Sequence, residues 1–179
     1  DEGRGTIAND KARSRHALVN TDWDIKPKGN SYEFLNDQYL ELDKATSVQL
    51  INEMDATLSF WTKTAIGQEA TLFSNGRGDG SEQSNGRENK WAINMTSSGN
   101  LTLASEGNSY VLTSNSIADD KWHHVTILFN RSGALVTYVD AVPVSSNEMA
   151  AIGGFSGDKI WLGARGSKDL AGIETIDNF

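Results

Sequence analysis

The chain has 179 residues, 24 acidic and 16 basic side chains, and no cysteine. Its length suits one domain that buries about two-thirds of its unfolded surface, and its formal charge of −8 argues against a nucleic-acid-binding protein, which needs a basic face. The missing cysteine excludes disulfides, thiolate metal sites and thiol nucleophiles, and no apolar run approaches the roughly 20 residues of a membrane span.

Short segments of β-forming residues recur along the chain, separated by Gly, Asn, Asp and Ser. We expect a loose segment over 1–15, one short helix over 47–54, and an exposed loop over 75–89, which has no apolar side chain. Many short strands with frequent turns predict an all-β antiparallel β-sandwich or jelly roll. The predicted strands are, in chain order, 31–35, 38–42, 56–64, 70–74, 90–95, 100–104, 109–113, 122–130, 134–140, 159–163 and 173–178.

The strand over 122–130 is the clearest of these. Val125, Ile127 and Phe129 share one face, because side chains alternate along a strand. The residues between them are also largely apolar or aromatic. We therefore expect a central strand that is covered on both sides.

Turn residues and a histidine pair add detail to this pattern. Residues 98–100 and 131–133 each stand between two predicted strands and predict hairpins. His123 and His124 are adjacent on one strand, so their rings point to opposite faces and cannot ligate one metal ion together. We expect one ring to pack against the sheet and the other to meet solvent or a neighbouring strand.

Six motifs follow one another along the chain: YLEL at 39–42, LSFW at 58–61, WHHVT at 122–126, VTYVD at 136–140, IWLGAR at 160–165 and GIETIDNF at 172–179. In this order they resemble the laminin-G-like and concanavalin A-like jelly-roll family. This resemblance covers about residues 31–179 and implies a single domain over 1–179 of an exported protein that is secreted, periplasmic or on the cell surface. We also expect the native polypeptide to continue past Phe179, with other domains of a longer chain as partners.

One position departs from the family pattern, since Ala141 replaces the hairpin glycine after Asp140. A type I′ turn needs a positive φ at both central residues, and alanine resists this by roughly 1 kcal/mol. We therefore expect a different turn or local strain there.

The resemblance implies a calcium site, because laminin-G-like domains often bind Ca²⁺ near the acidic closing segment. Asp177 and Asn178 stand in that segment, and Asn36 and Asp37 approach it if the first and last strands pair. Asp10, in the N-terminal loop, is a further candidate. Carboxylate and amide oxygens are the ligands that Ca²⁺ prefers. The alternative is that Asp37 and Asp177 only cap turns.

The five tryptophans are candidates for stacking on a sugar ring. Trp23, which lies in a polar stretch, is the first candidate for ligand binding and Tyr110 the second, whereas Trp91 opens a strand and fits either a buried or an exposed position. Three others lie inside apolar strands, where we expect burial: Trp61, Trp122 and Trp161.

Glycoside hydrolysis is the catalytic alternative for this fold. It needs two carboxyl groups facing each other, about 5–9.5 Å apart. Glu41 and Asp43 alternate but have no third member, and Glu174 and Asp177 lie on opposite faces of a strand. We therefore expect a non-catalytic extracellular binding module for carbohydrate or another glycoconjugate, assisted by Ca²⁺. The alternatives are a glycoside hydrolase and a structural accessory domain of a larger exported protein.

Overall fold

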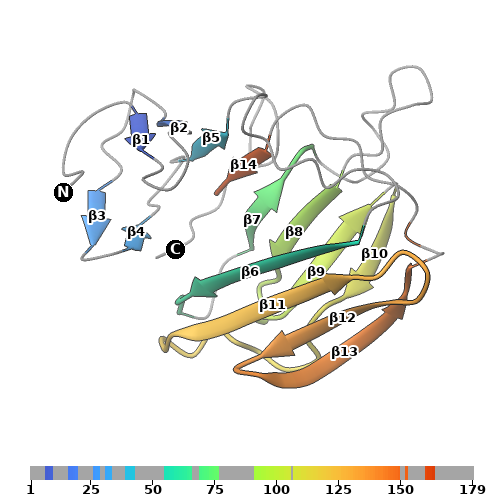
Figure 1. The fold of residues 1–179 in the computed structure, drawn as a ribbon. Helices are drawn as coiled ribbons and strands as arrows, with labels where there is room; N and C mark the ends of the chain where they lie inside the picture. The colour runs from blue at the N-terminus through green and yellow to red at the C-terminus, as the bar shows by residue number, and fades with distance from the viewer. Residues whose placement is uncertain are drawn as a thin grey trace.

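The computed structural model describes residues 7–9, 16–19, 26–28, 31–33, 39–42, 55–65, 69–76, 91–105, 107–149, 152 and 160–163, with side chains from residue 39 onward. These residues contain no α-helix, and their strands form antiparallel sheets (Figure 1). The predicted all-β sandwich is therefore confirmed.

Two sheets make up the sandwich, and a separate hairpin joins β3 (Lys26–Lys28) to β4 (Ser31–Glu33). The larger sheet consists, in spatial order, of β1 (Ile7–Asn9), β2 (His16–Val19), β5 (Leu40–Leu42), β14 (Ile160–Leu162), β7 (Ala70–Ser74), β8 (Trp91–Met95), β9 (Leu101–Ser105) and β10 (Asn108–Val111). The smaller sheet consists of β13 (Val142–Glu148), β12 (Ala134–Val139), β11 (His123–Phe129) and β6 (Ala56–Thr62).

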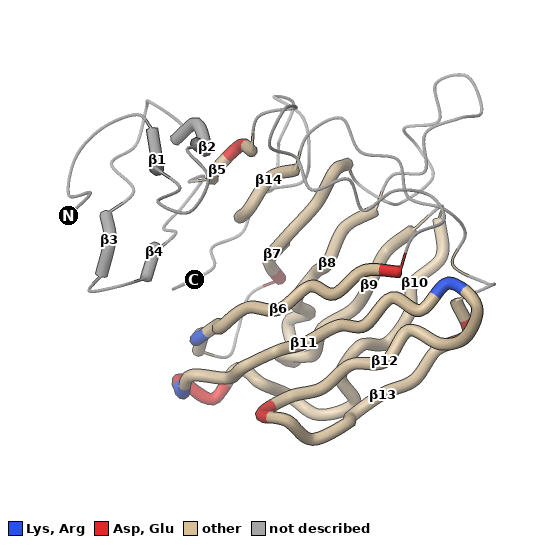
Figure 2. Tube along the Cα trace, in the orientation of Figure 1, with Lys and Arg blue, Asp and Glu red and all other residues tan. Residues whose placement is uncertain are grey.

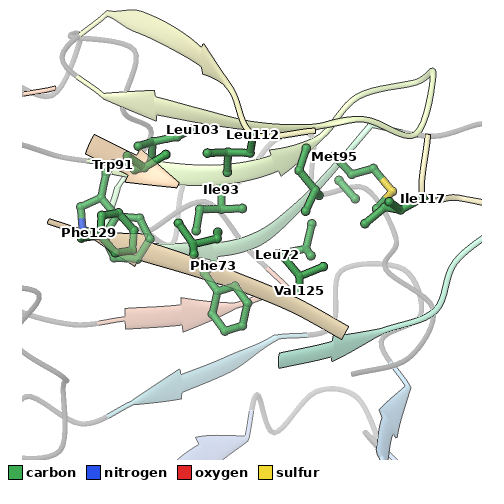
Figure 3. Packing of buried hydrophobic residues seen from close by; sticks show 14 of the residues in the cluster. Leu72, Phe73, Trp91, Ile93, Met95, Leu103, Leu112, Ile117, Val125 and Phe129 are labelled. Atoms are coloured by element: carbon green, nitrogen blue, oxygen red, sulfur yellow. The ribbon is translucent and has the colours of Figure 1, made fainter. Parts of the chain in front are cut away.

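The core fills the space between β7–β10 and the smaller sheet. Leu72, Ile93 and Leu103 of the larger sheet are fully buried, and Figure 3 shows their side chains gathered with those of Val125 and Phe129. Trp91, which the sequence left open, is only 2% exposed. Burial of apolar side chains is the main favourable term in folding, so this two-sided layer holds the sheets together.

The strand predicted over 122–130 is β11, and it lies between β12 and β6 as expected. Val125, Ile127 and Phe129 are buried, which confirms the predicted inner face. The alternate residues are half-buried rather than covered. One side of the smaller sheet is therefore partly open to solvent.

Both predicted hairpin turns are present. Gly99, at a φ of 82°, donates its N–H to Thr96 in the turn between β8 and β9. In the turn between β11 and β12, Gly133 donates its N–H to the carbonyl of Asn130.

The turn at Asp140 and Ala141 leads into β13, a strand that the sequence pattern did not predict. Both residues have a positive φ, 50° and 66°, as a type I′ turn requires. We expected either a different turn or local strain at this position, and the structure shows local strain. β13 contains Pro143 and several polar residues, and it forms an edge of the smaller sheet, a position where proline is tolerated.

Several expectations lie outside the described residues. These are the helix over 47–54, the closing strand over 173–178, and most of the loop over 75–89. In the segment over 1–15, which was expected to be loose, residues 7–9 form β1.

We predict that Ala141→Gly stabilises the protein. An alanine with a positive φ destabilises the folded state by about 1–2 kcal/mol, and glycine removes this strain. Glycine also makes the unfolded chain more flexible, which offsets about 0.4–1 kcal/mol of the gain. Urea unfolding should show a gain of about 0.5–1 kcal/mol. The control is Ala134→Gly within β12, which should lose stability by a similar amount. Equal stability of Ala141→Gly and the wild type would contradict the strain.

Candidate functional site

The open side of the smaller sheet begins with β6. Leu58 and Phe60 pack against the core, and the ring centroids of Phe60 and Phe73 lie 4.8 Å apart. Because side chains alternate along a strand, Ser59 and Trp61 are directed away from the core, and both are exposed. We call the outward side of β6, β11, β12 and β13 the open face.

Trp61 is 56% exposed and Trp122 is 43% exposed, so the prediction that both are buried is wrong. The apolar run of LSFW suggested a core strand, but alternation directs only Leu58 and Phe60 inward. In β11 the odd-numbered residues face the core. Trp122 immediately precedes this strand and has an even number, so the same alternation directs it away from the core. The third tryptophan of that prediction, Trp161, is half-buried, and its Nε1 donates to Glu41 at 3.1 Å.

The aromatic side chains of the open face adjoin hydrogen-bonding groups. Trp61 lies opposite His124 in the ladder, and the two ring centroids are 5.0 Å apart at 38°. The Nε2 of His124 shares a hydrogen bond of 2.8 Å with the hydroxyl of Ser59, which also lies 3.4 Å from the hydroxyl of Thr126. An exposed indole beside hydroxyl and imidazole groups can offer an apolar surface and directional hydrogen bonds to one ligand.

A cluster that we call the histidine brace lies at the end of the smaller sheet that carries Trp61. It consists of Asp119, His123 and Asp140. His123 binds Asp140 through Nδ1 at 2.8 Å and Asp119 through Nε2 at 2.9 Å. Asp140 also accepts a hydrogen bond of 2.9 Å from the backbone N–H of His124. The two adjacent histidines therefore have separate partners, and the brace connects the strained turn to the start of β11.

The brace shifts the pKa values of its members. Burial by itself lowers the pKa of His123, but the hydrogen bonds to Asp140 and Asp119 outweigh it and raise this pKa above 6.5. The backbone N–H of His124, followed by the His123 ring, lowers the pKa of Asp140. Hydrogen bonds from Lys121 and His123 hold the pKa of Asp119 well below its usual value.

These carboxyl groups are unsuited to acid catalysis. A glycosidase needs one carboxylic acid with a raised pKa that remains protonated until it donates its proton. Asp119 and Asp140 both have lowered pKa values and are bound to one imidazole. The pair therefore acts as two anions that hold a histidine.

In the smaller sheet, the charged residues stand mostly at the strand ends (Figure 2). Lys63 pairs with Asp120 at 3.2 Å, and Lys121 pairs with Asp119 at 2.8 Å. Charge at this end is thus arranged in pairs, whereas β6, β11 and β12 contain no Asp, Glu, Lys or Arg.

The predicted calcium ligands Asp10, Asn36, Asp37, Asp177 and Asn178 lie outside the described residues, so the calcium site stays a prediction. Within the part of the chain that is described, His, Asp and Glu side chains form no group of three that could hold a metal ion. That part also contains no helix long and apolar enough to cross a membrane.

Of the two aromatic ligand-binding candidates, Trp23 also lies outside the described residues. Tyr110, on β10, is half-buried and packs against the core. The exposed aromatic residue found instead is Trp61. The sequence signal that could have identified it is the alternation in LSFW, which directs Trp61 away from the core when Leu58 and Phe60 face it.

Comparisons with known proteins agree with this architecture. A family profile described as the concanavalin A-like lectin/glucanases superfamily matches residues 34–178, and no curated protein matches the chain. The receptor binding domain of botulinum neurotoxin D is similar in structure, with a TM-score of 0.61 and 15% identity over 97% of this chain and 48% of that one.

Two further solved structures are similar to this chain in fold. The ligand binding domain of botulinum neurotoxin serotype D, in complex with N-acetylneuraminic acid, has a TM-score of 0.58 and 16% identity over 96% of this chain and 45% of that one. The binding domain of Paraclostridial Mosquitocidal Protein 1 has a TM-score of 0.57 and 14% identity over 98% of this chain and 42% of that one. At these identities the likeness shows the fold, and this chain spans less than half the length of each structure.

We predict that the brace makes stability depend on pH. The raised pKa of His123 adds stability that is complete below about pH 6.5 and is lost as the pH rises through the folded value. The lowered pKa of Asp140 adds stability above about pH 3.8 that is lost on acidification. The free energy of unfolding should therefore be greatest between these limits.

Urea unfolding from pH 3 to pH 9 checks this expectation. His123→Gln should abolish most of the decline on the alkaline side, whereas His124→Gln, which keeps the brace, should retain it. An unchanged decline in His123→Gln would contradict the role of the brace.

Proposed function

This chain belongs to the concanavalin A-like lectin/glucanase superfamily, and we propose that it is a non-catalytic carbohydrate-binding module. The observation that carries the proposal is the exposed indole of Trp61 beside His124 and Ser59. A sugar ring has an apolar face and a rim of hydroxyl groups. The open face matches both, with an aromatic surface and with hydrogen-bonding side chains next to it.

Energetics support a ligand at this position. Water contact with apolar surface costs about 25 cal/mol per Å², and the indole of Trp61 is left more than half exposed. A ligand that covers it recovers part of this cost. Its neighbour His124 is already held by Ser59, and its backbone N–H is held by Asp140, so little side-chain freedom is lost on binding.

The relatives add support for the ligand class. One similar structure, a botulinum neurotoxin ligand binding domain of which this chain covers 45%, is in complex with N-acetylneuraminic acid, which supports a sugar as the class of ligand. Extracellular glycoconjugates are the natural partners of such a module. We accordingly assign the protein to an exported location, as a domain that directs a longer chain to its glycan.

Calcium belongs to the proposal as a second element. Asp37 and Asp177, with Asn36, Asn178 and Asp10, would supply the carboxylate and amide oxygens that Ca²⁺ prefers.

We predict that Trp61→Ala weakens glycan binding at least tenfold, which corresponds to about 1.4 kcal/mol. Binding is first detected on a glycan array with Ca²⁺ and with EDTA, and is then measured by isothermal titration calorimetry. The matched control is Val111→Ala, an exposed apolar residue on the larger sheet, which should bind as the wild type does. Absence of binding to every glycan in both conditions would overturn the proposed function.

We predict that millimolar Ca²⁺ raises the melting temperature and that EDTA reverses this rise. A ligand at 100 times its Kd stabilises the native state by about 2.7 kcal/mol, which is a shift of several degrees for a domain of this size. Asp177→Asn should lose the shift, and Mg²⁺ serves as the control ion. A melting temperature unmoved by Ca²⁺ would remove calcium from the proposal and leave the Trp61 site untouched.

A further inference from the structure

We propose that the ligand is an uncharged oligosaccharide of at least three sugar units, which crosses β6, β11 and β12 diagonally and stacks on Trp61 at one end and Tyr138 at the other. This inference rests on the proposed function, since it names the class of sugar that the open face binds. Three observations carry it: the position of Tyr138, its spacing from Trp61, and the absence of free charge between them.

Tyr138 lies on the open face of β12. Its ladder partner Thr126 is also the partner of Ser59 on β6, so the three side chains form one row across the sheet. Thr137, the residue before Tyr138, is fully buried. Alternation therefore directs the Tyr138 ring outward, where it is half-buried.

The two rings are separated by a length that suits several sugar units. Trp61 lies opposite His124, whereas Tyr138 lies opposite Thr126, two residues further along β11. Adjacent strands lie about 4.8 Å apart and residues i and i+2 about 6.8 Å apart, which puts the Cα atoms of Trp61 and Tyr138 roughly 12 Å apart.

A pyranose ring with its linking oxygen, built from bonds of about 1.5 Å, spans about 5 Å. Rings stacked on Trp61 and on Tyr138 are therefore two units apart, with one unit between them. A single sugar cannot reach both platforms.

The space between the two rings is lined with hydrogen-bonding groups. Ser59 is the β6 member of the Tyr138 row, two residues from Trp61, and its hydroxyl lies 2.8 Å from His124 Nε2 and 3.4 Å from the hydroxyl of Thr126. These groups can donate to or accept from sugar hydroxyls. The middle sugar unit would contact them.

Charge on this face favours a neutral ligand. An anionic sugar needs a cation to replace its lost hydration, because a buried unpaired charge is costly. Among the described residues near Trp61, Lys63 is paired with Asp120 and Lys121 with Asp119. Figure 2 shows the middle of β6, β11 and β12 without charged residues. The described residues of this face therefore offer hydroxyl and aromatic contacts, and no free cation, to the ligand.

Calorimetry with sugars of increasing length tests the inference. The probes are gluco-oligosaccharides with β-1,4 or β-1,3 links and manno-oligosaccharides, each from one to four units. Oligogalacturonides and sialyllactose are the charged comparison. We expect the affinity for the series that binds to rise at least tenfold between one and three units and to level off after that.

Variants separate the two platforms. Tyr138→Ala should remove the gain with length, and Tyr138→Phe, which keeps the ring, should restore the gain. Trp61→Ala should weaken binding at every length. Circular dichroism of each variant checks that the fold is retained.

The outcomes distinguish this inference from the proposed function. Equal affinity for one and three units, or a gain with length that survives in Tyr138→Ala, overturns the inference and leaves carbohydrate binding in place. Tighter binding of the charged sugars than of the neutral ones also overturns it. Failure of every sugar to bind overturns both.

Discussion

Alternate burial along the strands of the smaller sheet determines most of what this molecule can do. Val125, Ile127 and Phe129 must face the larger sheet to complete the core, since their burial supplies the main stabilising term. With a period of two, every residue between them is then directed away from the core. The open face is thus a consequence of core formation, and the side chains that it carries are available for binding.

The histidine brace explains how a strained turn is kept. Asp140 is among the residues that tolerate a positive φ, whereas Ala141 is not. Asp140 donates its N–H to the carbonyl of His124 at 2.8 Å and accepts from the N–H of His124 and from His123. These hydrogen bonds hold Asp140 in position, so the hairpin keeps its geometry and Ala141 takes on the strain.

Sequence patterns were sufficient for the fold and insufficient for the site. Apolar alternation identified β11, and turn residues located its hairpin, because both depend on local chemistry. The exposure of Trp61 was missed because the run LSFW was interpreted as uniformly buried, although Phe60 already occupied the core position. β13 was missed because Pro143 and its polar neighbours resemble a loop, and only the pairing with β12 makes them a strand.

The aromatic site and the brace occupy the same end of the smaller sheet, and this placement has a thermodynamic consequence. A binding site gains affinity when its groups are ordered before the ligand arrives. His123 and His124 are neighbours in the chain: one is fixed by two carboxylates, and the other by Ser59 and Trp61. The histidine brace therefore holds the backbone from which the uncharged side chains of the open face project. Its own charged groups lie outside the open face. Stability and the recognition that we propose thus depend on adjacent residues of one strand that point in opposite directions.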